Sequence, residues 1–313
     1  MNKKPLTYFF EFDQCGDYSG GAMPFMLPYA LKSLARHGVR HIVLTHSLFP
    51  LLMRYKGLSY KIKEAVAEAG LDFVDAHSVC GTWWDLNEPD DARRQEMIAT
   101  HIHTMALAAS MGVKTITIHV GNSISPGRSY PPGPWLDAIT HTTREQMIDN
   151  AVKALKILVP YAETLEMTIC IENVRYVCTT PEALLEIKRN FPSEALGFCC
   201  DVGHANISHF LYKASEFPEH RAMAADTSTP LSLQIIKQML PNMVNCHLHD
   251  NDGSDDQHLL PGQGTLDWPA ISELLKQAPR LKCLQSEVLP ARNGVTLPDL
   301  VSTFQRIFGD WTE

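Results

Sequence analysis

A group of histidine, aspartate and asparagine side chains follows an apolar run in the last third of the sequence. The run covers residues 244–246, and residues 247–252 continue it as His-Leu-His-Asp-Asn-Asp. Side chains of these types bind metal ions or transfer protons. A second group, with Asp256 and His258, precedes a turn rich in glycine and proline at residues 261–264. We interpret this region as one part of a chemical site whose other parts lie elsewhere in the chain.

Metal-ligand side chains of the same kinds recur where other apolar runs end. The intervals between successive members range from 29 to 53 residues, about one strand and one helix with their connections. Any one of these residues alone is as well explained by an ordinary hydrogen-bonded polar group in a core or at a rim. Six in succession are difficult to obtain by chance, and they predict a shared site. They are His77, His119, Glu172, Asp201, His247 and Glu287.

Short β-branched or apolar runs alternate with longer amphipathic segments along the chain. The short runs predict strands over residues 7–12, 41–45, 71–76, 115–118, 168–171, 196–200, 243–246 and 281–286. The amphipathic segments predict helices over residues 25–37, 60–69, 91–111, 143–165, 181–189, 230–239, 268–277 and 297–308. Three helices end at Gly38, Gly70 and Gly112, as helices often do. Thr142 or Thr143 is placed to cap the helix that follows it.

Eight strand–helix repeats predict an α/β fold, a (β/α)8 TIM barrel, as a single domain over residues 1–313. A doubly wound open sheet is the alternative, but the Gly-x-Gly-x-x-Gly motif that supports such a sheet does not follow the first strand. Residues 205–229 form a longer connection than usual. We interpret them as a lid or an interface insertion, and an interface would make the protein a homo-oligomer.

Composition and charge narrow the class of protein. The net charge of −8 argues weakly against a nucleic-acid partner, which favours a basic surface. No uncharged apolar stretch is long enough to span a membrane, and Glu11 and Asp13 interrupt the first apolar run, so we expect neither a membrane span nor a secretory signal. The cysteines form no Cys-x-x-Cys pair. Those inside apolar runs are interpreted as reduced and buried, which suits a cytoplasmic protein; they are Cys170, Cys199, Cys246 and Cys283.

In a TIM barrel the carboxyl ends of all strands meet on one face, where active sites form. Glu172, Asp201, His247 and Glu287 would therefore converge into a site of three carboxylates and one imidazole. Oxygen and nitrogen donors of this kind suit a divalent ion such as Mn²⁺, Mg²⁺, Co²⁺ or Zn²⁺, and no thiolate is needed.

Five short motifs, in this order, resemble those of the xylose isomerase-like barrel superfamily, which includes sugar isomerases, ketose 3-epimerases and endonuclease IV. The resemblance covers nearly the whole chain, and the order of the motifs is more specific for the superfamily than for any one reaction. The motifs are His119-Val120-Gly121, Ile171-Glu172-Asn173, Cys200-Asp201-Val202-Gly203-His204-Ala205-Asn206, His247-Leu248-His249-Asp250-Asn251-Asp252 and Ser286-Glu287.

The resemblance implies a metal site, and the two branches of the superfamily imply different numbers of ions. Isomerases and epimerases imply one divalent ion held by Glu172, Asp201, His247 and Glu287, with His204 on a substrate oxygen. Endonuclease IV implies three zinc ions, whose additional ligands would be His77, His119, His204, Asp256 and His258. The sequence contains all of these residues, so the number of ions stays open between one and three.

The sequence departs from the endonuclease IV pattern at two places. The first strand ends in Glu11-Phe12-Asp13-Gln14, without that family's Gly-Ala-His. The residues after Asn173 read Val-Arg-Tyr, where that family has a loop of the Thr-Ala-Gly-Gln-Gly type. Both departures weaken a DNA-repair interpretation.

We therefore expect a metal-dependent isomerase or epimerase that acts on a small-molecule carbohydrate or a derivative of one. Such a reaction removes a proton next to a carbonyl, and a divalent ion stabilises the negative charge that develops on oxygen. A carboxylate on each face of the substrate can take and return the proton, and the resemblance assigns these roles to Glu172 and Glu287. The alternative is a multi-zinc phosphoester hydrolase of the endonuclease IV type. A non-catalytic binding protein would leave the carboxylates idle.

Further residues could contact the substrate. Arg128 and Arg175 could bind a phosphate or a sugar acid, and Trp83 could stack on a sugar ring; a surface arginine and a tryptophan packed at the rim are the ordinary alternatives. His204 could instead be a ligand to an additional ion or a cap at a helix start. Alternation along the strand predicts that His249 points away from His247, toward the helix layer. Asp250 either orients His247 or lies in a surface turn.

Overall fold

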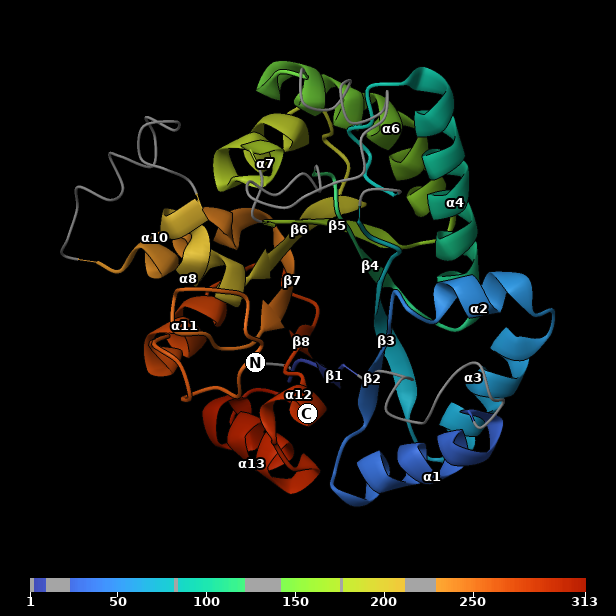
Figure 1. Cartoon of the computed structure of the whole chain (residues 1–313), viewed down its shortest axis with the longest axis vertical. Helices are drawn as coiled ribbons and strands as arrows, with labels where there is room; N and C mark the ends of the chain where they lie inside the picture. The colour runs from blue at the N-terminus through green and yellow to red at the C-terminus, as the bar shows by residue number, and fades with distance from the viewer. Residues whose placement is uncertain (1–2, 10–22, 82–83, 122–141, 175–176, 212–228) are drawn as a thin grey trace.

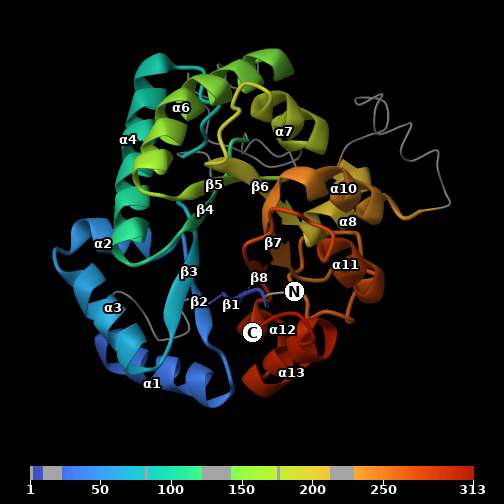
Figure 2. The same ribbon diagram turned by 180° about the vertical axis from the view of Figure 1, so that it is seen from behind.

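The computed structural model describes residues 3–9, 23–81, 84–121, 142–174, 177–211 and 229–313. Within these ranges the predicted fold class is confirmed: eight parallel strands close into a barrel in the order β1 to β8, and β1 pairs with β8. Figure 1 looks into the ring of strands with the helices arranged around it, and Figure 2 shows the same ring from behind. The single-domain organisation stays a prediction.

The strands are short and start close to the predicted positions. β6 and β7 extend past the predicted ends, so that Asp201 and His247 belong to the sheet itself. β8 begins three residues later than predicted. The strands are β1 (Leu6–Tyr8), β2 (His41–Leu44), β3 (Asp72–His77), β4 (Thr115–Ile118), β5 (Thr168–Glu172), β6 (Leu196–Asp201), β7 (Met243–Leu248) and β8 (Leu284–Ser286).

The eight predicted helices are present with small shifts at their ends. They are α1 (Met23–Arg36), α3 (Leu58–Glu68), α4 (Asp91–Ser110), α6 (Arg144–Thr164), α7 (Pro181–Lys188), α10 (Leu231–Met239), α11 (Trp268–Leu275) and α13 (Leu297–Phe308). Local chemistry explains the boundaries. Thr143 caps α6 in a capping box with Gln146, and Gly38, Gly70 and Gly112 have the positive φ that favours glycine after a helix.

Several short helices were not expected from the sequence. They are α2 (Phe49–Arg54), α8 (Val202–Leu211), α12 (Pro290–Asn293) and the 3₁₀ turns η3 (Val177–Thr179) and η4 (Leu240–Asn242). Part of the predicted lid or interface insertion is α8, which runs directly on from β6; residues 212–228 lie outside the described ranges. The connection after β6 therefore begins as regular secondary structure, not as a loop.

Apolar side chains fill the space between the strands and the surrounding helices. The barrel interior also contains polar side chains. Asp75 is fully buried there and accepts a hydrogen bond from Asn245 Nδ2 at 3.1 Å. Burial raises the pKa of Asp75 to about 6. The cysteines of the apolar runs are free and buried, as predicted. No helix in the described part of the chain is long and apolar enough to cross a membrane.

Candidate metal centre

The carboxyl ends of β3 to β8 bring the predicted ligands to one face of the barrel. His77, Glu172 and Asp201 are the last residues of their strands, and His247 is the last but one of β7. His119 and Glu287 each follow a strand end directly. A cavity of about 300 Å³ opens at this face. The candidate ligands among its lining residues are His77, His119, Glu172, His204, Asp256, His258 and Glu287.

His247 lies at the centre of the four residues predicted to hold one ion. Its Nδ1 atom lies 3.2 Å from Oε1 of Glu287, 3.5 Å from Oε1 of Glu172 and 3.8 Å from Oδ2 of Asp201. Its other ring nitrogen, Nε2, lies 3.4 Å from the hydroxyl of Thr117, which can accept its proton. The structure thus brings three carboxylates and one imidazole nitrogen together, and the ligand assignment itself stays a prediction.

Two more histidines approach Glu172 from β3 and β4. Nε2 of His119 lies 3.0 Å from Oε2 of Glu172, and Nε2 of His77 lies 3.5 Å from the same atom. Nδ1 of His77 is 2.9 Å from the carbonyl oxygen of Ser78, to which it can donate its proton. That hydrogen bond leaves Nε2 of His77 with a lone pair for a metal ion.

Asp256 joins two histidines that line the cavity with it. Nε2 of His204 lies 3.2 Å from Oδ2 of Asp256, and Nε2 of His258 lies 3.4 Å from the same oxygen. Each histidine has its Nδ1 on a main-chain carbonyl, at 3.1 Å from Asn173 for His204 and 2.7 Å from Glu287 for His258. Both rings therefore present the nitrogen that would bind an additional ion.

The first turn of α8 explains how Asp201 and His204 are positioned. Oδ1 of Asp201 accepts the backbone N–H of His204 at 2.7 Å, so Asp201 caps the helix that starts immediately after it. Asn173 bridges from β5: its Nδ2 donates to the Asp201 carbonyl and its Oδ1 accepts the Asp201 N–H. A cap and a strand-to-strand bridge thus orient both side chains before any ion binds.

The buried carboxylates and imidazoles of the cluster shift one another's pKa values. Burial opposes charge on His247, but the carboxylates of Glu287 and Glu172 raise its pKa to about 10. Burial would also raise the pKa of Glu172, yet His247 and His119 hold it well below its ordinary value. In the polypeptide alone, a proton on His247 offsets part of the carboxylate charge, and a bound cation would take over that role.

One further observation indicates that these residues are suited to bind a divalent cation. Nδ1 of His247 is completely buried and makes no well-aligned hydrogen bond within the described structure, although it faces three carboxylates. A buried ring nitrogen normally has a partner. A cation bound between this nitrogen and the carboxylates would satisfy all four groups.

His249 corrects one expectation. It points into the polar cluster, not toward the helix layer: its Nε2 lies 3.1 Å from both carboxylate oxygens of Asp201, and its ring stacks on His258 at 4.0 Å between centroids. The alternation rule fails because β7 ends at Leu248, so His249 is no longer on a pleated strand. His249 therefore contacts the predicted ligand Asp201 and can hold its carboxylate in place.

Asp250 corrects a second expectation, because it neither orients His247 nor lies in a surface turn. It is buried, and its carboxylate accepts hydrogen bonds from Trp268 Nε1 and from the backbone N–H groups of Gly262 and Leu266. It thus ties the loop of residues 251–266, which carries Asp256 and His258, to the barrel.

We expect Gly203→Ala to weaken metal binding, because a Cβ at residue 203 would overlap the ring of His249. The ring would have to leave Asp201, and loss of such a supporting contact lowers metal affinity by about 10- to 100-fold. Calorimetric titration with Mn²⁺ measures the effect. Ala205→Gly is the matched control, since it weakens the same helix by about 1 kcal/mol and adds no atom beside the ring. Wild-type affinity in the Gly203→Ala protein would contradict this role of His249.

Sequence reasoning missed His46 and Cys80, which also line the cavity. Burial, with the nearby His77 and His119, lowers the pKa of His46 to about 3, and burial raises the pKa of Cys80 to about 12. His46 follows the predicted second strand directly, so the strand-end rule would have found it. Cys80 lies three residues beyond His77 and carries no such signal. The predicted substrate-binding residues Arg128, Arg175 and Trp83 lie outside the described residues.

Comparison with known proteins supports the fold. The family described as xylose isomerase-like TIM barrel matches residues 31–281. Protein MJ1311 of Methanocaldococcus jannaschii, itself uncharacterized, is 26% identical over 191 residues, which make up 60% of this chain and 57% of that protein. The chain thus matches less than two thirds of that relative's length.

Two solved structures share the fold over almost their whole length. D-psicose 3-epimerase, solved in the presence of D-fructose, aligns with 98% of this chain and 99% of its own, with a TM-score of 0.69 and 14% identity. The IOLI protein, solved with a bound zinc atom, aligns with 99% of both chains, with a TM-score of 0.67 and 16% identity. At these identities the likeness shows a common fold, and the chemistry has to be argued from the site.

Proposed function

The chain belongs to the xylose isomerase-like TIM barrel family, and from that premise we propose that it is a divalent-metal-dependent isomerase or epimerase of a sugar or a sugar derivative. One observation carries the proposal: Glu172 and Glu287 both line the cavity and both lie within 3.5 Å of the same nitrogen of His247. Two acids thus lie beside the proposed cation site, at the wall of a space large enough for a small molecule.

The residues proposed to hold the ion are Glu172, Asp201, His247 and Glu287. A bound divalent cation such as Mn²⁺, Mg²⁺, Co²⁺ or Zn²⁺ would supply Lewis-acid stabilisation of negative charge on a substrate oxygen. The IOLI structure, with its zinc atom, supports a metal in this fold. One ion is proposed for this reaction.

The two glutamates are proposed to move the proton next to the substrate carbonyl. One carboxylate takes the proton from one face, and the other returns it from the opposite face or to the neighbouring carbon. Gln285 positions Glu287 by donating from Nε2 to Oε1 at 2.7 Å. Near-complete burial of Glu172 keeps competing water away from its carboxylate.

The remaining cavity residues are proposed to orient the substrate. His204 is one of the two histidines beside Asp256, and it lines the cavity. Its ring could therefore donate a hydrogen bond to a substrate hydroxyl. The substrate is proposed to be a small carbohydrate, with Arg128, Arg175 and Trp83 as further contacts. Free, buried cysteines are in keeping with a proposed location in the cytoplasm.

A multi-zinc phosphoester hydrolase is the second candidate function. The observation that favours it is the number of additional donors: His77 and His119 face Glu172, and His204 and His258 face Asp256. Such a set could hold up to three ions and activate water toward a phosphate. Metal analysis separates the two candidates, because one ion per chain favours isomerisation and two or three zinc ions favour hydrolysis.

Exchange with deuterated water tests the proposed function. The protein loaded with Mn²⁺ is incubated with a panel of ketoses, keto-sugars and their phosphates, and NMR follows the carbon-bound hydrogens. We expect deuterium to enter at a carbon next to the carbonyl of at least one sugar, with formation of its isomer or epimer. Abasic-site DNA is assayed in parallel with zinc. Cleavage of that DNA, with no exchange into any sugar, would favour the hydrolase instead.

A further inference from the structure

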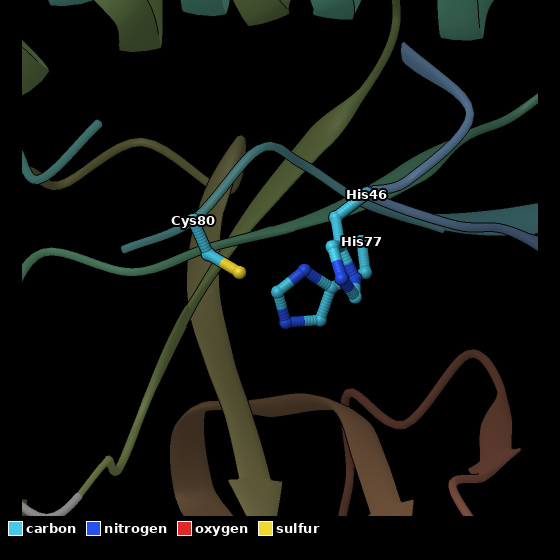
Figure 3. A group of neighbouring side chains, drawn as sticks. All are labelled: His46, His77 and Cys80. Atoms are coloured by element: carbon cyan, nitrogen blue, oxygen red, sulfur yellow. The ribbon is translucent and has the colours of Figure 1, made fainter. Parts of the chain in front are cut away.

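A group of two imidazoles and a thiol lies at the edge of the cavity, beside the carboxylate cluster. One ring nitrogen of His46, one ring nitrogen of His77 and the sulfur of Cys80 lie within 4.8 Å of one another. Figure 3 shows the sulfur directed toward the two rings. His46 follows β2, while His77 ends β3 and Cys80 follows it, so the group joins two neighbouring strand ends.

The donor atoms of this group differ from those of the carboxylate cluster. Three carboxylates and one imidazole suit hard ions such as Mg²⁺ and Mn²⁺, whereas two imidazoles and a thiolate suit Zn²⁺. Bonds of the usual length would place the ligand atoms of a tetrahedral zinc ion about 3.3–3.7 Å apart. Because no two of these atoms are more than 4.8 Å apart, binding zinc requires them to approach by at most about 1.5 Å, a movement open to side chains that line a cavity.

We propose that His46, His77 and Cys80 form a second, zinc-selective cation site. All three residues line the cavity, so the fourth position of a bound zinc ion would face the cavity and stay open to water or a small ligand, as in zinc sites with three protein ligands. Binding replaces the thiol proton, which is released to solvent.

The site has a consequence for turnover that rests on the proposed function. A zinc ion there would occupy part of the cavity that the sugar needs, and it would engage His77, which also faces Glu172 at 3.5 Å. Zinc in excess would then inhibit the reaction supported by Mn²⁺ or Mg²⁺. The zinc site itself does not depend on the identity of the reaction, and its test uses binding alone.

A competing arrangement uses His77 differently. His77, His119 and Glu172 also lie together, with both Nε2 atoms within 3.5 Å of one carboxylate oxygen. An ion held by those residues would have no sulfur ligand. The presence or absence of a metal–sulfur bond therefore distinguishes the proposed site from this arrangement.

Cobalt is the probe, since Co²⁺ bound to a thiolate absorbs in the near-ultraviolet through charge transfer from sulfur. The full-length protein is first saturated with Mg²⁺ and then titrated with Co²⁺ and, separately, with Zn²⁺. We expect the charge-transfer band in the wild-type protein and its loss in Cys80→Ser. In His46→Gln we expect affinity for Co²⁺ to fall by roughly 100-fold, because even supporting contacts cost 10- to 100-fold.

Two control variants make the result decisive. His41→Gln changes the first residue of β2, at the opposite end of that strand from His46. His41 pairs with Asp72, and this variant should keep the band. His119→Gln removes a ligand of the competing arrangement and should also keep it. Thermal unfolding checks that each variant is folded. No band in the wild-type protein, a band that survives Cys80→Ser, or a band lost in His119→Gln would each overturn the proposal.

Discussion

Replacement of Glu287 by glutamine is expected to lower turnover of the responsive sugar by about 10²- to 10⁴-fold, the usual contribution of a general acid–base group. The amide keeps the shape of the side chain and can still accept the hydrogen bond that Gln285 donates to Oε1. It cannot take a proton from carbon. Initial rates with saturating Mn²⁺, measured beside the bound metal content, separate lost proton transfer from lost metal.

Solvent exchange gives a finer readout of the same variant. If two carboxylates serve opposite faces of an epimerisation, Glu287→Gln should stop interconversion but leave exchange of deuterium into one of the two epimers through Glu172. Glu273→Gln is the matched control, because this glutamate on α11 has an exposed side chain paired with Lys276 and lies away from the strand ends. A Glu287→Gln protein with near-normal turnover would remove Glu287 from the catalytic role.

Removal of the divalent ion is expected to abolish turnover and lower thermal stability. An ion present at 100–1,000 times its Kd stabilises the folded chain by about 2.7–4.1 kcal/mol. For a chain of 313 residues, typical unfolding entropies convert this to a rise in Tm of roughly 4–6 °C. Differential scanning calorimetry after chelation, and again after addition of Mn²⁺, measures the difference.

Two variants test whether the ion binds at the carboxylate cluster, one in the cluster and one outside it. Asp201→Asn removes one of the carboxylates that face Nδ1 of His247, so added Mn²⁺ should shift its Tm by much less than that of the wild-type protein. His41→Gln, at the opposite end of the barrel, should respond like the wild-type protein. An equal metal-induced shift in Asp201→Asn would show that the cation binds elsewhere.

The amino-acid sequence was enough to predict the barrel and the strand ends that carry the site. Apolar runs and amphipathic segments alternate by local periodicity, which needs no knowledge of distant contacts. Once eight such units form a parallel barrel, topology alone sends Glu172, Asp201, His247 and Glu287 to one face. Their proximity in the structure follows from chain order, although their binding of metal stays to be tested.

The directions and contacts of side chains beyond the strand ends depend on the tertiary structure. Strand alternation could not place His249, because its direction depends on how the chain turns after Leu248 and on the space left by Gly203. Asp250 found its partners in Gly262, Leu266 and Trp268, which come from a loop and a helix start further along the chain. The meeting of His46, His77 and Cys80 depends likewise on neighbouring turns. Local pattern determines which side chains reach the rim, whereas packing and backbone angles in the turns determine where each one points.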